Sequence, residues 1–496
     1  MKKITKLLLL GVMLCFVMIL NVNAVSITTN TTSGTVDTNS KYVTNTSTLT
    51  VSGVQSSDTF KAYKILDTFY NSTNNTITYE FTSTFKSFLT STNGQTNDYS
   101  SLTVAGYQAL TSGDTTNGST TTNSTLDTLV SLYATYIKTN SVTGSNMTVS
   151  GTNATASLEA GAWLVLPTTT TKVYAVMVGN VELKSNTGGT GWDITSPTIV
   201  AKVSSASVTK VLKGTSATEG TYNINEDYNY VITASVPTFP TNATNKTLTV
   251  KETLDNGITF GAISNVVIKD GGTTLTTNAD GTVKDEGNHT VATITQNGQE
   301  VTITFNADYI TTNTITIEYP AKLNSSATLG APGNDTTTTL TYATEPYSTA
   351  TTTTNGVVNT VRTYGIRLFK KDSSNNGLQG AVYTVYSDSG LNTSVGTITT
   401  DGTGYGTIDG LKSGTYYLKE TTAPFGYRIN NDILTVTINT SNDYTETNQE
   451  DSKMGLLPST GGVGTYIFIV IGAIAVVGSL VFLYKYLNKN KNKNGK

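Results

Sequence analysis

A lysine and a glutamate in the last third of the chain have the side chains best suited to chemistry. Lys370 follows Ile366 and Leu368 at alternate positions, and Glu420 follows Leu418 in the same way. Alternation of this kind places residues on one face of a β-strand, here the inward face. Burial disfavours the charged form of both groups, which frees the amine as a nucleophile and lets the carboxyl keep its proton. The pair therefore predicts either a buried salt bridge or an acid–base site that acts on the amine.

A second lysine and glutamate follow the same pattern in the middle of the chain. Lys210 lies between Val208 and Leu212 at alternate positions, and Glu252 follows Val250. Each would lie on an inward strand face. Residues 25–203 show no convincing combination of this kind.

The elements that must hold these residues are β-strands. Charged residues make up only 13% of the 496 residues, and 27 are tyrosine. Threonine and tyrosine favour strands, whereas asparagine and glycine favour turns, so the predicted class is all-β. The chain is long enough for three domains, expected at 25–203, 204–362 and 363–450. We expect tandem immunoglobulin-like β-sandwiches.

The first of these expected domains also has one helical pattern. Apolar residues recur at helical spacing within "NSTLDTLVSLYATYIKT", namely Leu126, Leu129, Val130, Tyr133 and Ile137. The pattern predicts one helix that covers a sheet.

The two ends of the chain predict export and membrane attachment. Residues 1–24 combine three lysines, an apolar run and a final Ala24, as a secretory signal peptide does. Residues 466–484 are free of charge and precede a basic tail at 485–496, which predicts a transmembrane helix with a cytoplasmic end. Without 1–24 and 461–496, 23 basic residues remain against 34 acidic ones, a net charge of −11. Such a surface argues against binding of nucleic acid.

The motif before the apolar run is similar to the cell-wall sorting signal that sortases process in Gram-positive bacteria. The residues are Leu457, Pro458, Ser459, Thr460 and Gly461. The resemblance implies that a sortase cleaves the Thr460–Gly461 bond and joins Thr460 to an amine. The implied partners are sortase, peptidoglycan and other subunits. The implied location is the cell surface, reached through a membrane-held precursor.

Residues 363–450 resemble the CnaB-like β-sandwiches of collagen adhesins and Gram-positive pilins. The resemblance rests on "IRLFKKDSSNNGLQGAVYTVY", on "YYLKETTAPFGY", which is similar to the family's E-box, and on "YTETNQ" near the end. It implies that Lys370 attacks the side-chain amide of Asn448. Ammonia would leave, and Glu420 would shuttle the proton. A salt bridge with a solvated Asn448 is the alternative.

The same resemblance extends to the middle domain, where related domains place a lysine and an acid like Lys210 and Glu252. Thr336 occupies the position expected for the acceptor asparagine. Asn334, on the same strand face, would replace it if the strand paired two residues further along.

The order of segments resembles a backbone pilin. Such pilins polymerise through a lysine at the end of their first domain, and Lys202 has nearly that position, although the usual "YP" before it is missing. Because Ile199, Ala201 and Val203 would face inward, Lys202 should be exposed. If Lys202 is an ordinary surface lysine, the alternative is a singly wall-anchored adhesin that binds a host-surface ligand.

Other chemistry finds little support in the residues. The expected mature chain contains one histidine, His289, and no cysteine, because Cys15 lies in the signal segment. That composition argues against most zinc sites and against a Ser-His-Asp triad. We expect no metal, no cofactor and no turnover enzyme, only single intramolecular events.

Overall fold

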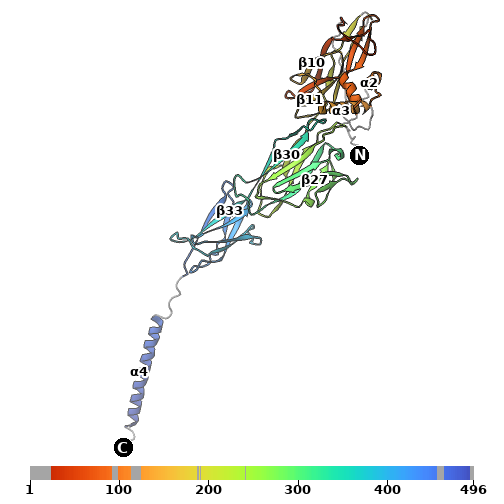
Figure 1. Ribbon diagram of the computed structural model, residues 1–496. Helices are drawn as coiled ribbons and strands as arrows, with labels where there is room; N and C mark the ends of the chain where they lie inside the picture. The colour runs from red at the N-terminus through yellow and green to blue at the C-terminus, as the bar shows by residue number, and fades with distance from the viewer. Residues whose placement is uncertain are drawn as a thin grey trace, which may run out of the picture. The chain divides into compact units, whose positions relative to one another are not determined.

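Strands make up most of the regular structure of this chain (Figure 1). The computed structural model describes residues 24–91, 99–112, 124–186, 189, 191–240, 242–454 and 463–491. They form two compact units, one of residues up to 362 except 329–331, the other of 329–331 and residues from 363 onward. The predicted all-β class is confirmed, with a few helices in addition.

Residues 24–204, called here the first region, form several small sheets with helices packed on them. The helices are α1 (Ser83–Leu89), α2 (Val104–Ser112) and α3 (Ser124–Thr139). The strands are β1 (Ala24–Val25), β2 (Thr29–Ser33), β3 (Lys41–Val43), β4 (Thr46–Ser52), β5 (Thr59–Lys64), β6 (Leu66–Asn71), β7 (Thr76–Phe81), β8 (Ser145–Asn146), β9 (Thr148–Ser150), β10 (Asn153–Glu159), β11 (Gly161–Thr169), β12 (Val173–Tyr174), β13 (Met177–Val181), β14 (Leu183–Ser185), β15 (Trp192–Ile194), β16 (Thr198–Val200) and β17 (Val203–Ser204).

The predicted helix is α3, and it covers a sheet as expected. Leu129, Val130, Tyr133 and Ile137 are buried in one cluster with residues of β5 and β11. The sequence analysis did not anticipate α1 and α2, which pack into the same cluster. Tyr347, from the connection that follows β30 (Asn334–Ala343), also belongs to this cluster. The first region therefore completes its core with a residue from the next part of the chain.

Residues 207–362, the middle region, bury one large core between two sheets. One sheet contains β18 (Ser207–Leu212), β20 (Asp227–Ser235), β29 (Thr314–Leu323), β23 (Val267–Asp270) and β24 (Thr273–Thr274), with β22 (Ile258–Phe260) paired to β29. The other contains β19 (Glu219–Thr221), β32 (Val357–Arg362), β30, β21 (Leu248–Leu254), β28 (Glu300–Phe305), β27 (Thr290–Asn297), β26 (Thr282–Lys284) and β25 (Thr276–Thr277), with β31 (Thr351–Thr353) paired to β30. Short 3-10 helices lie at Ile263–Asn265 and Ala307–Tyr309.

Residues 364–451, the third region, form a smaller two-sheet sandwich around its own core. One sheet has the order β36 (Tyr405–Leu411), β33 (Tyr364–Asp372), β39 (Tyr444–Asp451). The other has the order β35 (Ser394–Thr399), β34 (Val382–Tyr386), β37 (Thr415–Thr422), β38 (Leu434–Thr437). Strands β33 and β39, the first and last of this region, pair in parallel. A bond between them would join the two ends of the sandwich.

The C-terminal helix α4 (Val463–Lys491) contains the predicted membrane-spanning run. The candidate span is Tyr466–Asn488, within which an 18-residue stretch has a mean hydropathy of 2.7, and the helix is long enough to cross a bilayer.

Candidate functional sites: two buried lysine clusters

Strand alternation places Lys370 of β33 and Glu420 of β37 together in the core of the third region. The Lys370 side chain is fully buried, and its Nζ lies 3.1 Å from Glu420 Oε1. The same Nζ lies 2.5 Å from Asp451 Oδ1. It also donates hydrogen bonds to Tyr383 Oη at 2.7 Å and to Gln449 Oε1 at 3.1 Å. The predicted pairing of Lys370 with Glu420 is confirmed.

The electrostatics of this cluster favour a shared proton. One ammonium faces two buried carboxyls, Glu420 and Asp451, so a neutral cluster requires one carboxyl to be protonated. Burial raises the pKa of Glu420, as predicted; the backbone N–H of Asn430 and Lys370 partly offset that rise. Burial also raises the pKa of Tyr383, which keeps its hydroxyl as a donor to Gln449. The geometry can thus deliver a proton beside an amine.

The expected position of Asn448 is wrong. Strand β39 pairs in parallel with β33 so that Gln449 lies opposite Lys370 and Asn448 opposite Phe369. Because side chains alternate between faces, Asn448 points to solvent. Gln449 and Asp451 point inward instead and are buried. Both contact Lys370, and the Asp451 carboxyl is the closer of the two.

Asp451 was not predicted because the resemblance implied an asparagine as the acceptor on the last strand. The sequence did contain a signal, because Glu446 lies on the same strand face as Asn448. The exposed contact of Glu446 with Arg367 confirms that this face points outward. The buried Asp451 also has a carboxylate oxygen, Oδ2, without a hydrogen-bond partner among the described residues.

The middle region holds its lysine in a different set of contacts. Lys210 of β18 is buried, and its Nζ contacts Glu252 Oε1 and lies 2.5 Å from Thr336 Oγ1. The rings of Tyr230 and Tyr319 lie 4.1 and 5.5 Å from the ammonium. Burial lowers the pKa of Lys210 to about 8, although Glu252 opposes the shift. The predicted Lys210–Glu252 pair is confirmed, and Thr336 stands beside it as expected.

Asn334 does not provide the partner that the alternative register required. Its side chain is buried, but its Oδ1 accepts from Thr328 N at 2.8 Å. Its Nδ2 donates to the carbonyls of Thr328 and Val361. Strand β30 pairs with β21 so that Thr338 lies opposite Glu252 and Thr336 opposite Leu254. The residue of β30 that contacts Lys210 is therefore Thr336, and the two-residue shift does not occur.

Asn359 on β32, the last strand of the middle region, is the amide that the sequence analysis overlooked. It pairs directly with Thr336 across β30 and β32, and it is fully buried. Its Nδ2 donates to the backbone carbonyl of Lys210 at 3.2 Å, while its Oδ1 has no partner among the described residues. The available signal was the alternation Val357, Asn359, Val361, which places an amide between apolar residues on an inward face.

Lys202 is half-buried, not exposed as expected. It lies between β16 and β17, and its backbone carbonyl accepts from Ala175 N. Ile199 is buried, whereas Ala201 and Val203 are only half-buried. The alternation is imperfect because Lys202 lies in the break between two short strands.

Several predicted segments lie outside the described residues. Leu457, Pro458, Ser459, Thr460 and Gly461 are among them, as is the signal segment apart from Ala24, which begins β1.

The first region has a lysine cluster that is more open than the other two. Lys64 Nζ lies 3.0 Å from Glu159 Oε2 and 3.3 Å from Asp67 Oδ1, and it donates to Tyr42 Oη. The Glu159 side chain is 37% exposed. Burial would raise the pKa of Glu159, but hydrogen bonds from Tyr42 and Lys64 outweigh it and lower the pKa. This cluster is an ordinary ion pair.

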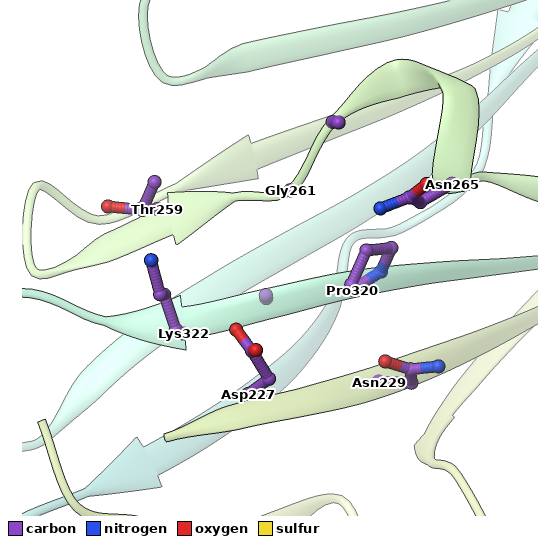
Figure 2. Close-up of a pocket in the computed structure, with 9 residues that line it drawn as sticks. Asp227, Asn229, Thr259, Gly261, Asn265, Pro320 and Lys322 are labelled. Atoms are coloured by element: carbon purple, nitrogen blue, oxygen red, sulfur yellow. The ribbon is translucent and has the colours of Figure 1, made fainter. Parts of the chain in front are cut away.

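A shallow groove on the middle region has no comparable concentration of groups (Figure 2). Asp227 and Asn229 come from β20, Thr259 from β22, and Pro320 and Lys322 from β29. Figure 2 shows these side chains spread along neighbouring strands rather than converging on a point. Among the described residues, no group of three or more His, Cys, Asp or Glu side chains could hold a metal ion.

Comparison with known proteins agrees with this architecture. Residues 365–453 match the SpaA family, a prealbumin-like fold domain, and residues 449–494 match the LPXTG cell wall anchor motif. The trypsin-resistant surface T6 protein of Streptococcus pyogenes serotype M6 is 26% identical over 61% of this chain and 71% of its own length.

Two solved structures of pilins are similar to this chain. The T6 backbone pilin of serotype M6 Streptococcus pyogenes superposes with a TM-score of 0.62 at 22% identity, covering 80% of each chain. The major pilin SpaD of Corynebacterium diphtheriae gives a TM-score of 0.48 at 17% identity, covering 83% of this chain and 98% of that one. This chain therefore has the fold of a Gram-positive backbone pilin and carries a SpaA prealbumin-like domain with an LPXTG anchor, the mark of a surface protein attached to the cell wall.

Proposed function

We propose that this protein is the shaft-forming subunit of a sortase-assembled pilus, with two isopeptide bonds that it forms by itself. The observation that carries the proposal is the fully buried cluster of Lys370, Glu420 and Asp451, which spans the first and last strands of the third region. The LPXTG anchor and the likeness to the T6 backbone pilin support it. The role is structural rather than enzymatic.

Assembly would use the sorting motif and a lysine of a neighbouring copy. Sortase cleaves after Thr460 and transfers its carbonyl to an amine. For shaft growth, the amine is Lys202 of the next subunit; for the final attachment, it is an amine of the peptidoglycan. Lys202 would need to turn outward from its half-buried position to be reached.

In the third region the bond would join Lys370 Nζ to Asp451 Cγ. Proton transfer within the cluster gives a neutral amine and a protonated Asp451. Nζ attacks Cγ, the Cγ–O bond breaks, and water leaves with the hydroxyl of Asp451 and one proton from Nζ. Glu420, 3.1 Å from Nζ and with a raised pKa, relays that proton. The fixed geometry gives the reactants a high effective concentration.

In the middle region the bond would join Lys210 Nζ to Asn359 Cγ. Here the leaving group is the Asn359 amide nitrogen, which departs as ammonia. Glu252 takes a proton from Nζ and delivers it to that nitrogen. The lowered pKa of Lys210 makes its neutral form accessible near physiological pH.

The two bonds would serve under mechanical load. Each would close a large loop: Lys370 and Asp451 are 81 residues apart, and Lys210 and Asn359 are 149 apart. Because β33 and β39 lie side by side in parallel, tension applied at the two ends of the third region would fall on the bond before it peels the strands apart.

The test of the shaft role is a covalent ladder in cell-wall extracts. We expect high-molecular-weight ladders that resist denaturant and that disappear in Lys202→Ala and Thr460→Ala. Lys172→Ala, at another half-buried lysine of the first region, is the matched control and should leave the ladder intact. A single wall-linked band from the wild type would overturn the shaft role.

That last outcome would favour a singly anchored adhesin that binds a host-surface ligand. The observation in its favour is the half-buried position of Lys202, because an acceptor lysine must reach a sortase active site. Binding of the wild-type protein to host cells without ladder formation would support it.

A further inference from the structure

Three large apolar side chains in the loop between β37 and β38, and a fourth three residues after β39, are exposed. Phe425 is fully exposed at 102%, Met454 is 59% exposed, and Ile429 and Ile433 are 46% and 44% exposed. We call these four residues the apolar tip. Phe425 and Met454 lie on segments that backbone hydrogen bonds join, and exposed apolar side chains gathered in this way often mark an interaction site.

The apolar tip is held by hydrogen bonds. Pro424 to Tyr427 form a turn closed by a hydrogen bond of 3.0 Å from Tyr427 N to Pro424 O. Gly426, third in the turn, has a φ of +84°, which glycine adopts without strain. Phe425 therefore stands at the corner of the turn.

This turn is tied to the end of the chain that leads to the sorting motif. Met454 N donates to Gly426 O at 2.9 Å, and Arg428 N donates to Ser452 O at 3.2 Å. Next along the loop, Asn430 N donates to Glu420 Oε2 at 2.6 Å. The tip is thus connected through its backbone to the buried cluster of the third region.

The length of chain after the tip limits what can cover it. Thr460 lies six positions after Met454, and a fully extended chain spans at most about 3.6 Å per residue. Whatever is bonded to Thr460 therefore lies within about 22 Å of Met454. In a polymer, Thr460 is bonded to the acceptor subunit, so the surface of that subunit must come close to the tip.

We infer that the apolar tip docks on the next copy of this chain in the shaft, an inference that rests on the proposed function. The contact would position the acceptor lysine during transfer and then cover the tip in the finished polymer. Sortase and the bilayer are near the tip only while the precursor is processed, whereas the neighbouring copy stays beside it permanently.

The test compares Phe425→Asp with wild type in the same Gram-positive host. We expect the ladder to fall about tenfold relative to monomer, as loss of a central apolar anchor does in other interfaces. Removal of the C-terminal helix by sortase should be unchanged, with the excess appearing as wall-linked monomer. Phe425→Leu, which keeps an apolar side chain, should restore the ladder. Val358→Asp, at a 49% exposed valine of the middle region, should leave it unchanged.

The remaining outcomes overturn the inference in distinguishable ways. Equal ladders from Phe425→Asp and wild type would overturn the docking role alone. Accumulation of uncleaved precursor would assign the tip to sortase or to the bilayer instead. A wild type without any ladder would overturn the shaft function and the docking role together. Intact mass and thermal unfolding of purified Phe425→Asp should match the wild type apart from the substitution, which excludes misfolding as the cause.

Discussion

The middle and third regions bury the same lysine–glutamate pair in different surroundings. Lys370 has a second carboxyl, Asp451, and the polar groups of Tyr383 and Gln449 around it. Around Lys210 there are instead two tyrosine rings, a threonine and the amide of Asn359.

The partner of each lysine determines how many protons its cluster needs to be neutral. Two carboxyls beside one ammonium need an extra proton for neutrality, and in the proposed reaction the leaving group would be water. One carboxylate beside one ammonium is already neutral, and there the amide would leave as ammonia. The two sites would therefore form the same type of bond with different leaving groups.

The largest effect should follow loss of the lysine in the third region. Lys370→Ala leaves Glu420 and Asp451 buried without their cation and prevents the bond. We expect the free energy of unfolding of this region to fall by about 5 kcal/mol, and the loss of a water mass to be abolished. Denaturant unfolding and intact mass measure both. Lys371→Ala, one residue along on the other strand face, is the control and should keep the water loss.

Next in size is the loss of the amide in the middle region. Asn359→Ala should abolish one ammonia loss and lower the free energy of unfolding by about 4–5 kcal/mol on the loop-closure argument. Asn334→Ala removes a buried amide from the same face and keeps Lys210, Glu252 and Asn359 in place. If Asn334→Ala, rather than Asn359→Ala, abolishes the ammonia loss, the assignment of the acceptor is wrong.

A Lys210 that is not bonded to Asn359 should make the free energy of unfolding depend on pH. In Asn359→Ala the folded state holds Lys210 with a pKa near 8, below the unfolded value of about 10.4. Between those values the unfolded chain binds more protons, so the free energy of unfolding should rise with pH. We expect a rise on the order of 1–3 kcal/mol from pH 8 to pH 10 by chemical denaturation. The linked wild type has no amine at this site and should lack this rise.

A smaller change in stability is expected when the acceptor of the third region is changed from a carboxyl to an amide. Asp451→Asn replaces a leaving hydroxyl with a leaving amide, so the third region should lose ammonia instead of water. Stability should change by less than about 1 kcal/mol because the bond still forms and the side chain keeps its size. High-resolution intact mass distinguishes the two losses. Retention of a water loss in Asp451→Asn would show that another carboxyl, such as that of Glu420 at 3.1 Å from Lys370 Nζ, is the acceptor.

The smallest change in stability is expected for the lysine cluster of the first region. Lys64→Met removes a partly exposed ion pair, which is typically worth about 0–1 kcal/mol. The intact mass should change by the substitution alone. An additional mass change would mean that this cluster also reacts.

Alternation of apolar residues predicted which side chains of the long strands point inward. It failed for β39, where the inward face is decided by the pairing register with β33. Lys370, Glu420, Lys210 and Glu252 were recognised because apolar neighbours flank them at alternate positions. Asn448 was misplaced because "YTETNQED" has no apolar residue to mark its inward face; only pairing with β33 decides that Asp451 points inward.

Non-local contacts explain the other failures. Asn359 meets Lys210 across 149 residues, a contact that no local pattern encodes. Lys202 was expected to be exposed from strand alternation, but it lies in a break between strands where that rule does not hold. Helices α1 and α2 were missed because each is short, at seven and nine residues.

The most direct test of the central claim is the intact mass of recombinant residues 25–460 with Glu420→Ala beside it. We expect a wild type lighter than its sequence by one water and one ammonia, and a Glu420→Ala protein that keeps only the ammonia loss. Peptide mapping should then join Lys370 to Asp451 and Lys210 to Asn359. A wild-type mass equal to the sequence would contradict the account, since both buried lysines would then be no more than ion pairs.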